Sequence, residues 1–229
     1  MNFVRGAMVG VAGMVAIAAG AAGAEPGRGP TAAHESRAID VAKFPMAKPG
    51  VYPSEKKGAG LLRVLLLTGQ MNKYHKWEET TPYLRAMLEG TGRFAVDIHT
   101  MPPFGSDLSG WDPKFEDYPV VLMNVDGDYW PEATRKRFEG LVKSGRVGLS
   151  VVHSADNAWK DWGEWNEMIA VGGWGGRDAS AGPYLRWRDG QVVRDDKPGP
   201  CGGHGARKPF VITHRVPDHP VVKGLPVTW

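Results

Sequence analysis

Three short apolar runs limit what this chain can fold into more than any other feature of its sequence. They span residues 61–68 (LLRVLLLT), 118–124 (YPVVLMN) and 147–153 (VGLSVVH). Short runs rich in Val and Leu are typical of parallel strands that are buried on both faces of a sheet. A fourth run at 94–100 (FAVDIHT) alternates in polarity, as expected for a more exposed strand.

Helical patterns lie between these runs. Residues 77–88 place apolar side chains on one face, Pro131 suits the first turn of a helix over 131–143, and residues 159–170 are a third candidate. Strands that alternate with helices indicate βαβ units with helices on both faces of a parallel sheet. The sequence therefore predicts a three-layer α/β fold. We expect two later strands, at 184–189 and 210–215.

The first 24 residues have the pattern of a secretory signal peptide. A positive charge at Arg5 precedes an apolar stretch over 7–21, and a small-x-small cleavage site ends at Ala24. The apolar stretch is too short for a membrane span, which needs about 20 strongly apolar residues. We therefore expect an exported protein, periplasmic or extracellular, whose mature chain begins at Glu25.

Residues 25–60 are rich in Pro, Gly and Ala and show no sustained periodicity. This composition indicates a leader or linker, and we expect poor packing up to about Lys57. The domain itself is then predicted to span 61–229, long enough for one α/β core.

Composition excludes several classes of protein and site. Cys201 is the one cysteine in the sequence, which excludes an internal disulfide. The formal net charge is +3 and no basic cluster is interleaved with aromatic residues, so nucleic-acid binding has no support. Nine tryptophans, several of them between Trp159 and Trp187, are mostly explained by core packing, and stacking against sugar rings is the less favoured alternative.

The run at 147–153 ends at a histidine that is a candidate catalytic residue. His153 is followed by Ser154, Ala155 and Asp156. Ligands of open α/β sheets bind at the carboxyl ends of the strands, and histidine is the side chain whose ordinary pKa permits proton transfer near neutral pH. A structural histidine that is satisfied by a neighbouring carbonyl group stays open as the alternative.

His75 follows the run at 61–68, so we expect it on the same edge of the sheet as His153. Further candidates follow other strands or lie in later loops. Histidines beside carboxylates suit general acid–base catalysis or a divalent-metal site. The spacing matches no compact metal motif, and the sequence contains no P-loop, dinucleotide fingerprint or G-x-S-x-G motif. A metal held by His75, His153 and His219 therefore stays an alternative, and no other cofactor is expected. The candidates for substrate binding are His204, Trp162, Trp174, Asp126 and Asp218.

Four motifs together resemble the ThuA-like (trehalose utilisation) family: LLLTG with a downstream His75, VGLSVVHSAD, GGHGARKPFVITHR and DHPVVKGLPVTW. The resemblance covers about 61–229 and implies a flavodoxin-like sheet, similar to that of class I glutamine amidotransferases. Those enzymes place a nucleophilic cysteine where this chain has His153, so amidotransferase chemistry has no nucleophile here. Family members usually continue beyond the residue that matches Trp229, so we expect the fold to lack its C-terminal elements.

The resemblance also implies a role in sugar metabolism, especially the breakdown of 3-keto disaccharides. We expect a hydrolase or isomerase of keto-sugars or disaccharides, with His153, His75 and His219 as acid–base groups and Asp156 or Asp218 orienting an imidazole. A non-catalytic sugar-binding module or an inactive fragment is the alternative. The expected partner is a small carbohydrate, without nucleic acid or membrane, and homo-oligomerisation is left open.

Overall fold

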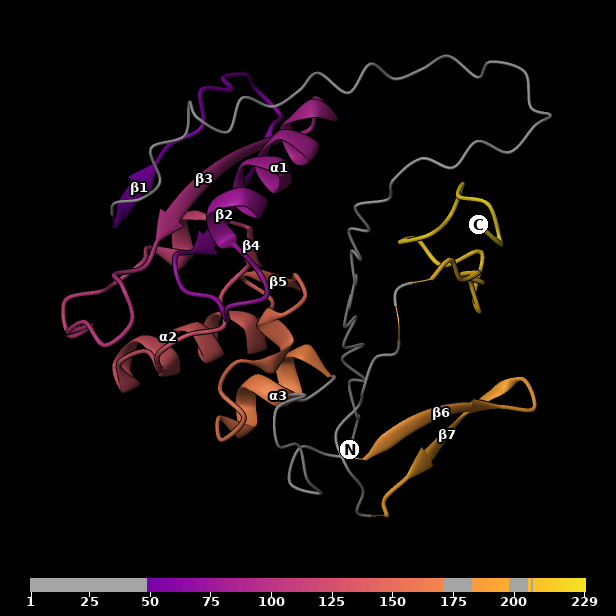
Figure 1. Cartoon of the computed structure of the whole chain (residues 1–229). Helices are drawn as coiled ribbons and strands as arrows, with labels where there is room; N and C mark the ends of the chain where they lie inside the picture. The colour runs from indigo at the N-terminus through magenta and orange to yellow at the C-terminus, as the bar shows by residue number, and fades with distance from the viewer. Residues whose placement is uncertain (1–48, 171–182, 198–205, 207) are drawn as a thin grey trace, which may run out of the picture.

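A computed structural model of the chain describes residues 49–170, 183–197, 206 and 208–229. Its main body is a five-stranded sheet in the order β1-β3-β2-β4-β5 (Figure 1). Strands β2 to β5 pair in parallel, and their order is that of a flavodoxin-like sheet. The predicted fold class is therefore confirmed. The strands are β1 (Gly50–Tyr52), β2 (Leu62–Thr68), β3 (Phe94–Thr100), β4 (Val120–Met123) and β5 (Gly148–Val151).

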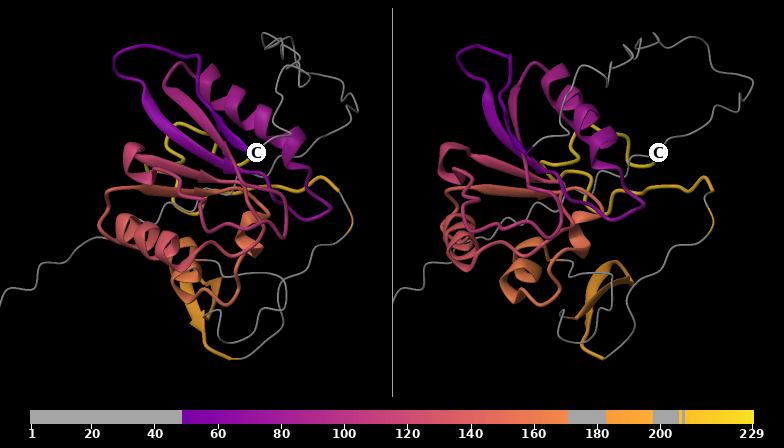
Figure 2. Two further views of the ribbon diagram at one scale, coloured as in Figure 1. Left: turned by 90° about the vertical axis from the view of Figure 1, so that its left-hand side faces the viewer. Right: turned by 60° about the vertical axis from the view of Figure 1, so that its left-hand side comes forward.

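Helices cover both faces of this sheet. Alternate residues of β2 enter two separate cores, because successive side chains of a strand point to opposite faces. Leu66 packs in the core that contains Leu84 of α1. Leu65 packs in the core that contains Phe138 of α2 and Trp165 of α3, on the other face (Figures 1 and 2). The helices are α1 (Trp77–Gly90), α2 (Glu132–Lys143) and α3 (Gly163–Ile169).

Strand β1 lies within the segment predicted as a poorly packed leader. It pairs antiparallel with the edge strand β3, and Ser54 behind it is buried. The backbone N–H of Ser54 donates a hydrogen bond to Oδ1 of Asp97 at 2.7 Å. The expectation of poor packing up to Lys57 is therefore wrong for this strand, because main-chain pairing holds it to the sheet. The proposed signal peptide, with its cleavage site at Ala24, lies outside the described residues.

Two later elements differ from the expected ones. The helix expected over 159–170 begins only at Gly163, because Ala155–Asn157 forms a 3-10 turn and Trp159 takes a positive φ of 55°. The prediction of a strand at 210–215 is wrong, because this stretch forms only an isolated bridge between Thr213 and Thr228.

The strand expected at 184–189 is confirmed as β6 (Tyr184–Arg188), but it belongs to a separate hairpin. Its partner is β7 (Gln191–Asp195), which pairs with it antiparallel. Asp189 and Gly190 connect the two strands with φ of 50° and 80°, the positive values that a two-residue type I′ turn needs. In the parts of the chain that the structure describes, no helix is long and apolar enough to cross a membrane.

Candidate functional site

The loops after β2, β4 and β5 meet at the carboxyl edge of the sheet. The chain continues from β2 to β3 on one side and returns to β4 on the other side. Ligands of such folds bind outside the carboxyl ends of the strands where the order reverses in this way. Asn72 follows β2, Asp126 follows β4 and His153 follows β5, so all three lie at this edge.

His75 and His153 lie side by side there, which confirms their predicted placement. Their ring centroids are 4.9 Å apart and the ring planes are nearly perpendicular, at 89°. Nδ1 of His153 lies 3.3 Å from Oδ1 of the buried Asp156, one turn further along the chain. When His153 is protonated, the two side chains therefore form an ion pair.

The environment of His75 favours the neutral form of this imidazole. Burial lowers the pKa of His75, and the neighbouring His153 lowers it further, while Asp126 and Asp156 oppose the shift. A neutral imidazole has one nitrogen that can accept a proton. The pair thus places a potential proton acceptor beside a histidine that can form an ion pair with a carboxylate.

Asn72 ties together the three loops that carry these residues. Its Nδ2 donates hydrogen bonds to Oδ2 of Asp126 at 2.8 Å and to Oγ of Ser154 at 2.7 Å. Its Oδ1 accepts the backbone N–H of Tyr74 at 3.1 Å, which shapes the turn that leads to His75. Neither Asn72 nor Ser154 was expected as a site residue. The sequence signal for Asn72 is a polar side chain in the loop that follows a buried strand.

A second polar network fixes the start of α1 just after His75. The hydroxyls of Thr68 and Thr81 are 2.8 Å apart, and Nδ2 of Asn124 lies 3.3 Å from the hydroxyls of Thr80 and Thr81. The network is largely buried and joins the ends of β2 and β4 to the first turns of α1. His75 therefore lies on a short loop whose two ends are both held.

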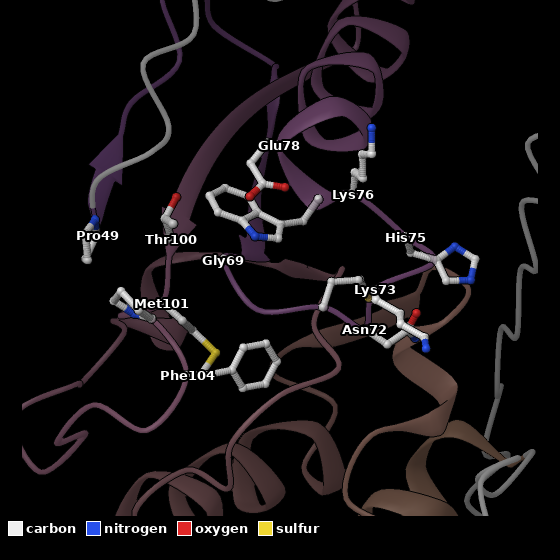
Figure 3. A pocket seen from close by; sticks show the side chains of 13 residues that line it. Pro49, Gly69, Asn72, Lys73, His75, Lys76, Glu78, Thr100, Met101 and Phe104 are labelled. Carbon is white, nitrogen blue, oxygen red and sulfur yellow. The ribbon is translucent and has the colours of Figure 1, made fainter.

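A cleft of about 470 Å³ opens beside His75, between the loops after β2 and β3 and the start of α1 (Figure 3). Gly69 lines it with a φ of 114°, and a Cβ there would lie 2.5 Å from the backbone nitrogen of Met101. Only glycine allows the two loops to approach so closely. The other lining residues are Pro49, Met71, Asn72, Lys73, His75, Lys76, Trp77, Glu78, Thr100, Met101, Pro103 and Phe104.

Trp162, expected to form an apolar wall of the site, lies in the core instead. Its side chain is 2% exposed and packs with the rings of Trp130, Trp159 and Trp165. Its Nε1 donates a hydrogen bond to Oε1 of Glu139 at 2.7 Å. The expectation is therefore wrong, because this ring fills the space between α2 and α3. The described tryptophans between 159 and 165 are core residues.

The other predicted residues are not all brought to the histidine pair. Asp218 and His219 are exposed in the C-terminal segment, which Figure 1 shows apart from the sheet. Nδ1 of His219 accepts a hydrogen bond from the backbone N–H of Val221 within that segment. The charged groups that act on His75 are His153, Asp126 and Asp156. His204, Trp174 and Cys201 lie outside the described residues.

The alternative metal site is likewise not assembled by the structure. Among the described residues, no group of three or more His, Cys, Asp or Glu side chains is arranged to hold a metal ion. His75 and His153 are neighbours, but His219 does not complete a set with them.

Comparison with known proteins places most of the chain in one family. Residues 63–229 match the family model for ThuA, described as trehalose utilisation. The crystal structure of a ThuA-like protein from Parabacteroides merdae ATCC 43184 superposes with a TM-score of 0.70 at 43% sequence identity. The match covers 74% of this chain and 60% of that protein, so this chain spans less than two thirds of the relative's length. No curated protein matches the sequence.

Proposed function

Because the chain belongs to the ThuA family, we propose that it processes a keto-sugar or a disaccharide as a hydrolase or isomerase. The observation that carries this proposal is the contact between His75 and His153 at the carboxyl edge of the sheet. Two imidazoles in contact, one of them 3.3 Å from a carboxylate, are suited to general acid–base catalysis.

The two histidines have different surroundings, which suggests different roles. His75 has a lowered pKa and is neutral at neutral pH, so it can accept a proton from the substrate. His153 has Asp156 beside its Nδ1, so a protonated His153 has a counter-charge and can donate a proton from Nε2. Pairs of titratable groups in contrasting environments are how acid and base roles are commonly divided.

The test is turnover of trehalose and of 3-keto disaccharides, with the products followed by chromatography. His153→Ala should lower the rate by about 10²–10⁴-fold, the usual contribution of a general acid or base. The melting temperature should stay nearly unchanged, because the side chain is 39% exposed. If rate and stability fall together, His153 is a structural residue. If the sugars bind but no product forms, the chain is a binding module.

A second variant tests the place of His219. The structure leaves this side chain exposed in the C-terminal segment, so His219→Ala should keep the wild-type rate. A loss as large as that caused by His153→Ala would mean that His219 enters the crevice, as the sequence predicts. The two variants together decide whether His219 takes part in the reaction with His153.

We also propose that the protein is exported, on the basis of the N-terminal sequence alone. The intact mass of protein recovered outside the cytoplasm should correspond to a chain that begins at Glu25. A mass that includes residues 1–24 would contradict cleavage after Ala24.

A further inference from the structure

Phe104 is an exposed aromatic ring on a loop that is held on both sides of it. The residue is 57% exposed. Before it, the carbonyl of Pro102 accepts a hydrogen bond from Nε2 of Gln70 at 2.7 Å. After it, the backbone N–H of Gly105 donates to Oδ2 of Asp128 at 2.6 Å. A ring that stays exposed adds little hydrophobic stabilisation, so the fold itself gains little from holding Phe104 there.

The cleft beside Phe104 combines apolar and polar walls. Phe104 and Trp77 are two of its aromatic residues, whereas Asn72 and Glu78 carry hydrogen-bonding groups. Figure 3 shows Phe104 across the cleft from Glu78, with His75 to one side. The volume of about 470 Å³ falls in the range of about 300–1,000 Å³ that is usual for small-molecule sites.

One buried polar group in the wall adds to this pattern. Thr100 is 2% exposed and lines the cleft, and its Oγ1 has no hydrogen-bond partner among the residues that the structure describes. Buried hydroxyl groups nearly always have a partner. The Oγ1 atom is itself covered, so a hydroxyl group in the cleft would pair with it after a small shift of the Thr100 side chain.

We propose that this cleft binds the second ring of a disaccharide, the ring that does not react, with Phe104 and Trp77 against its apolar face. A pyranose ring has a C–H face that suits aromatic side chains and a rim of hydroxyl groups that suits the carboxylate of Glu78. An aromatic ligand would cover this carboxylate without a hydrogen bond to it, which costs binding energy. His75 lines the cleft and also contacts His153, so the proposed second-ring site adjoins the histidine pair. The inference rests on the proposed function for the identity of the reacting ring.

The test is the affinity of the full chain for trehalose and for glucose, measured by calorimetry or ligand-observed NMR. Phe104→Ala should weaken trehalose binding by about ten-fold, because losing a buried aromatic contact is worth about one such factor. Glucose binding should change much less. Phe104→Tyr keeps the ring and should keep the affinity. Tyr83→Ala removes an aromatic ring of similar exposure on α1 and is the matched control.

The proposal is overturned if Phe104→Ala binds trehalose as the wild type does, or if it weakens trehalose and glucose equally. It is also overturned if the wild-type protein binds neither sugar. Product formation from 3-keto disaccharides reports separately on the proposed function. Product without any effect of Phe104→Ala would leave that function standing and remove the second-ring site. If Phe104→Ala loses affinity for trehalose and the wild type forms no product, the second-ring site stands and the proposed function is removed.

Discussion

Gln70 joins three loops around the cleft, and removing its amide should loosen all of them. The side chain is fully buried. Its Nε2 donates to the carbonyl of Pro102 at 2.7 Å and lies 3.3 Å from Oδ2 of Asp128. Its Oε1 accepts the backbone N–H of Asp128 at 2.7 Å. A Cβ on Gly127 would lie 2.2 Å from this Oε1, so the amide is packed directly against the next loop.

Gln70→Ala leaves two backbone groups, the Pro102 carbonyl and the Asp128 N–H, without these partners. Each buried group left unsatisfied costs about 1–3 kcal/mol, and water at the half-exposed loops recovers part of it. We therefore expect the free energy of unfolding to fall by about 2–4 kcal/mol. Urea unfolding followed by tryptophan fluorescence measures this value. Gln191→Ala, at an exposed position of β7, is the control and should stay within about 0.5 kcal/mol of the wild type.

Gln70→Glu separates hydrogen bonding from packing. The new carboxylate keeps the shape but faces Oδ2 of Asp128, which lies 3.3 Å from the nitrogen it replaces. Two facing carboxylates repel, and protonation of one restores a donor. Gln70→Glu should therefore be less destabilising at acidic pH than at neutral pH, relative to the wild type. A loss below about 0.5 kcal/mol in Gln70→Ala, or a pH-independent effect of Gln70→Glu, would refute this reasoning.

Four further predictions each concern a single residue. Gly69→Ala should lower the free energy of unfolding by about 2–5 kcal/mol in urea titrations, because residue 69 has a positive φ and a Cβ there would clash with the backbone of Met101. Gly140→Ala in α2, where a Cβ meets nothing, should raise it by about 0.5–1 kcal/mol. Trp162→Ala should lower the free energy of unfolding by about 3–5 kcal/mol, because this ring is buried in the core. A variant that stays stable but binds sugar more weakly would instead show that Trp162 belongs to the sugar-binding site. The folded state lowers the pKa of His75, so below about pH 6.5 the unfolded chain binds more protons than the folded chain, and the free energy of unfolding falls as the pH falls. His75→Gln should reduce this loss of stability, which urea titrations at several pH values would measure. The same lowered pKa should rise in His153→Gln, as an NMR titration of the His75 ring would show.

The sheet and the histidine pair were predictable because local patterns determine both. Near-continuous apolar runs at 61–68 and 147–153 have few alternatives to buried parallel strands. Parallel strands end at one edge, so His75 and His153 were expected on the same edge before any distance was known. The observed contact of 4.9 Å between ring centroids follows from topology together with position in the chain.

The cleft was not predictable, because it depends on contacts between residues distant in sequence. Phe104 lies in a loop whose composition shows only that it is irregular, and its neighbours are held by Gln70 and Asp128 from two other loops. Trp162 was misassigned for the same reason. Its sequence neighbourhood does not show that Glu139, 23 residues away, accepts its N–H in the core.

The proposed division of roles between the two histidines rests on burial more than on their mutual repulsion. Desolvation is the largest cause of the lowered pKa of His75, and the charge of His153 comes second. Burial alone therefore already favours the neutral form of His75, the form that can accept a proton. His153, two residues after β5 and beside Asp156, has the counter-charge that the proposed proton donor needs. The cleft lies on the side of His75, so a sugar ring bound there, as we propose, would adjoin the proposed base, and its binding would align the step of proton removal.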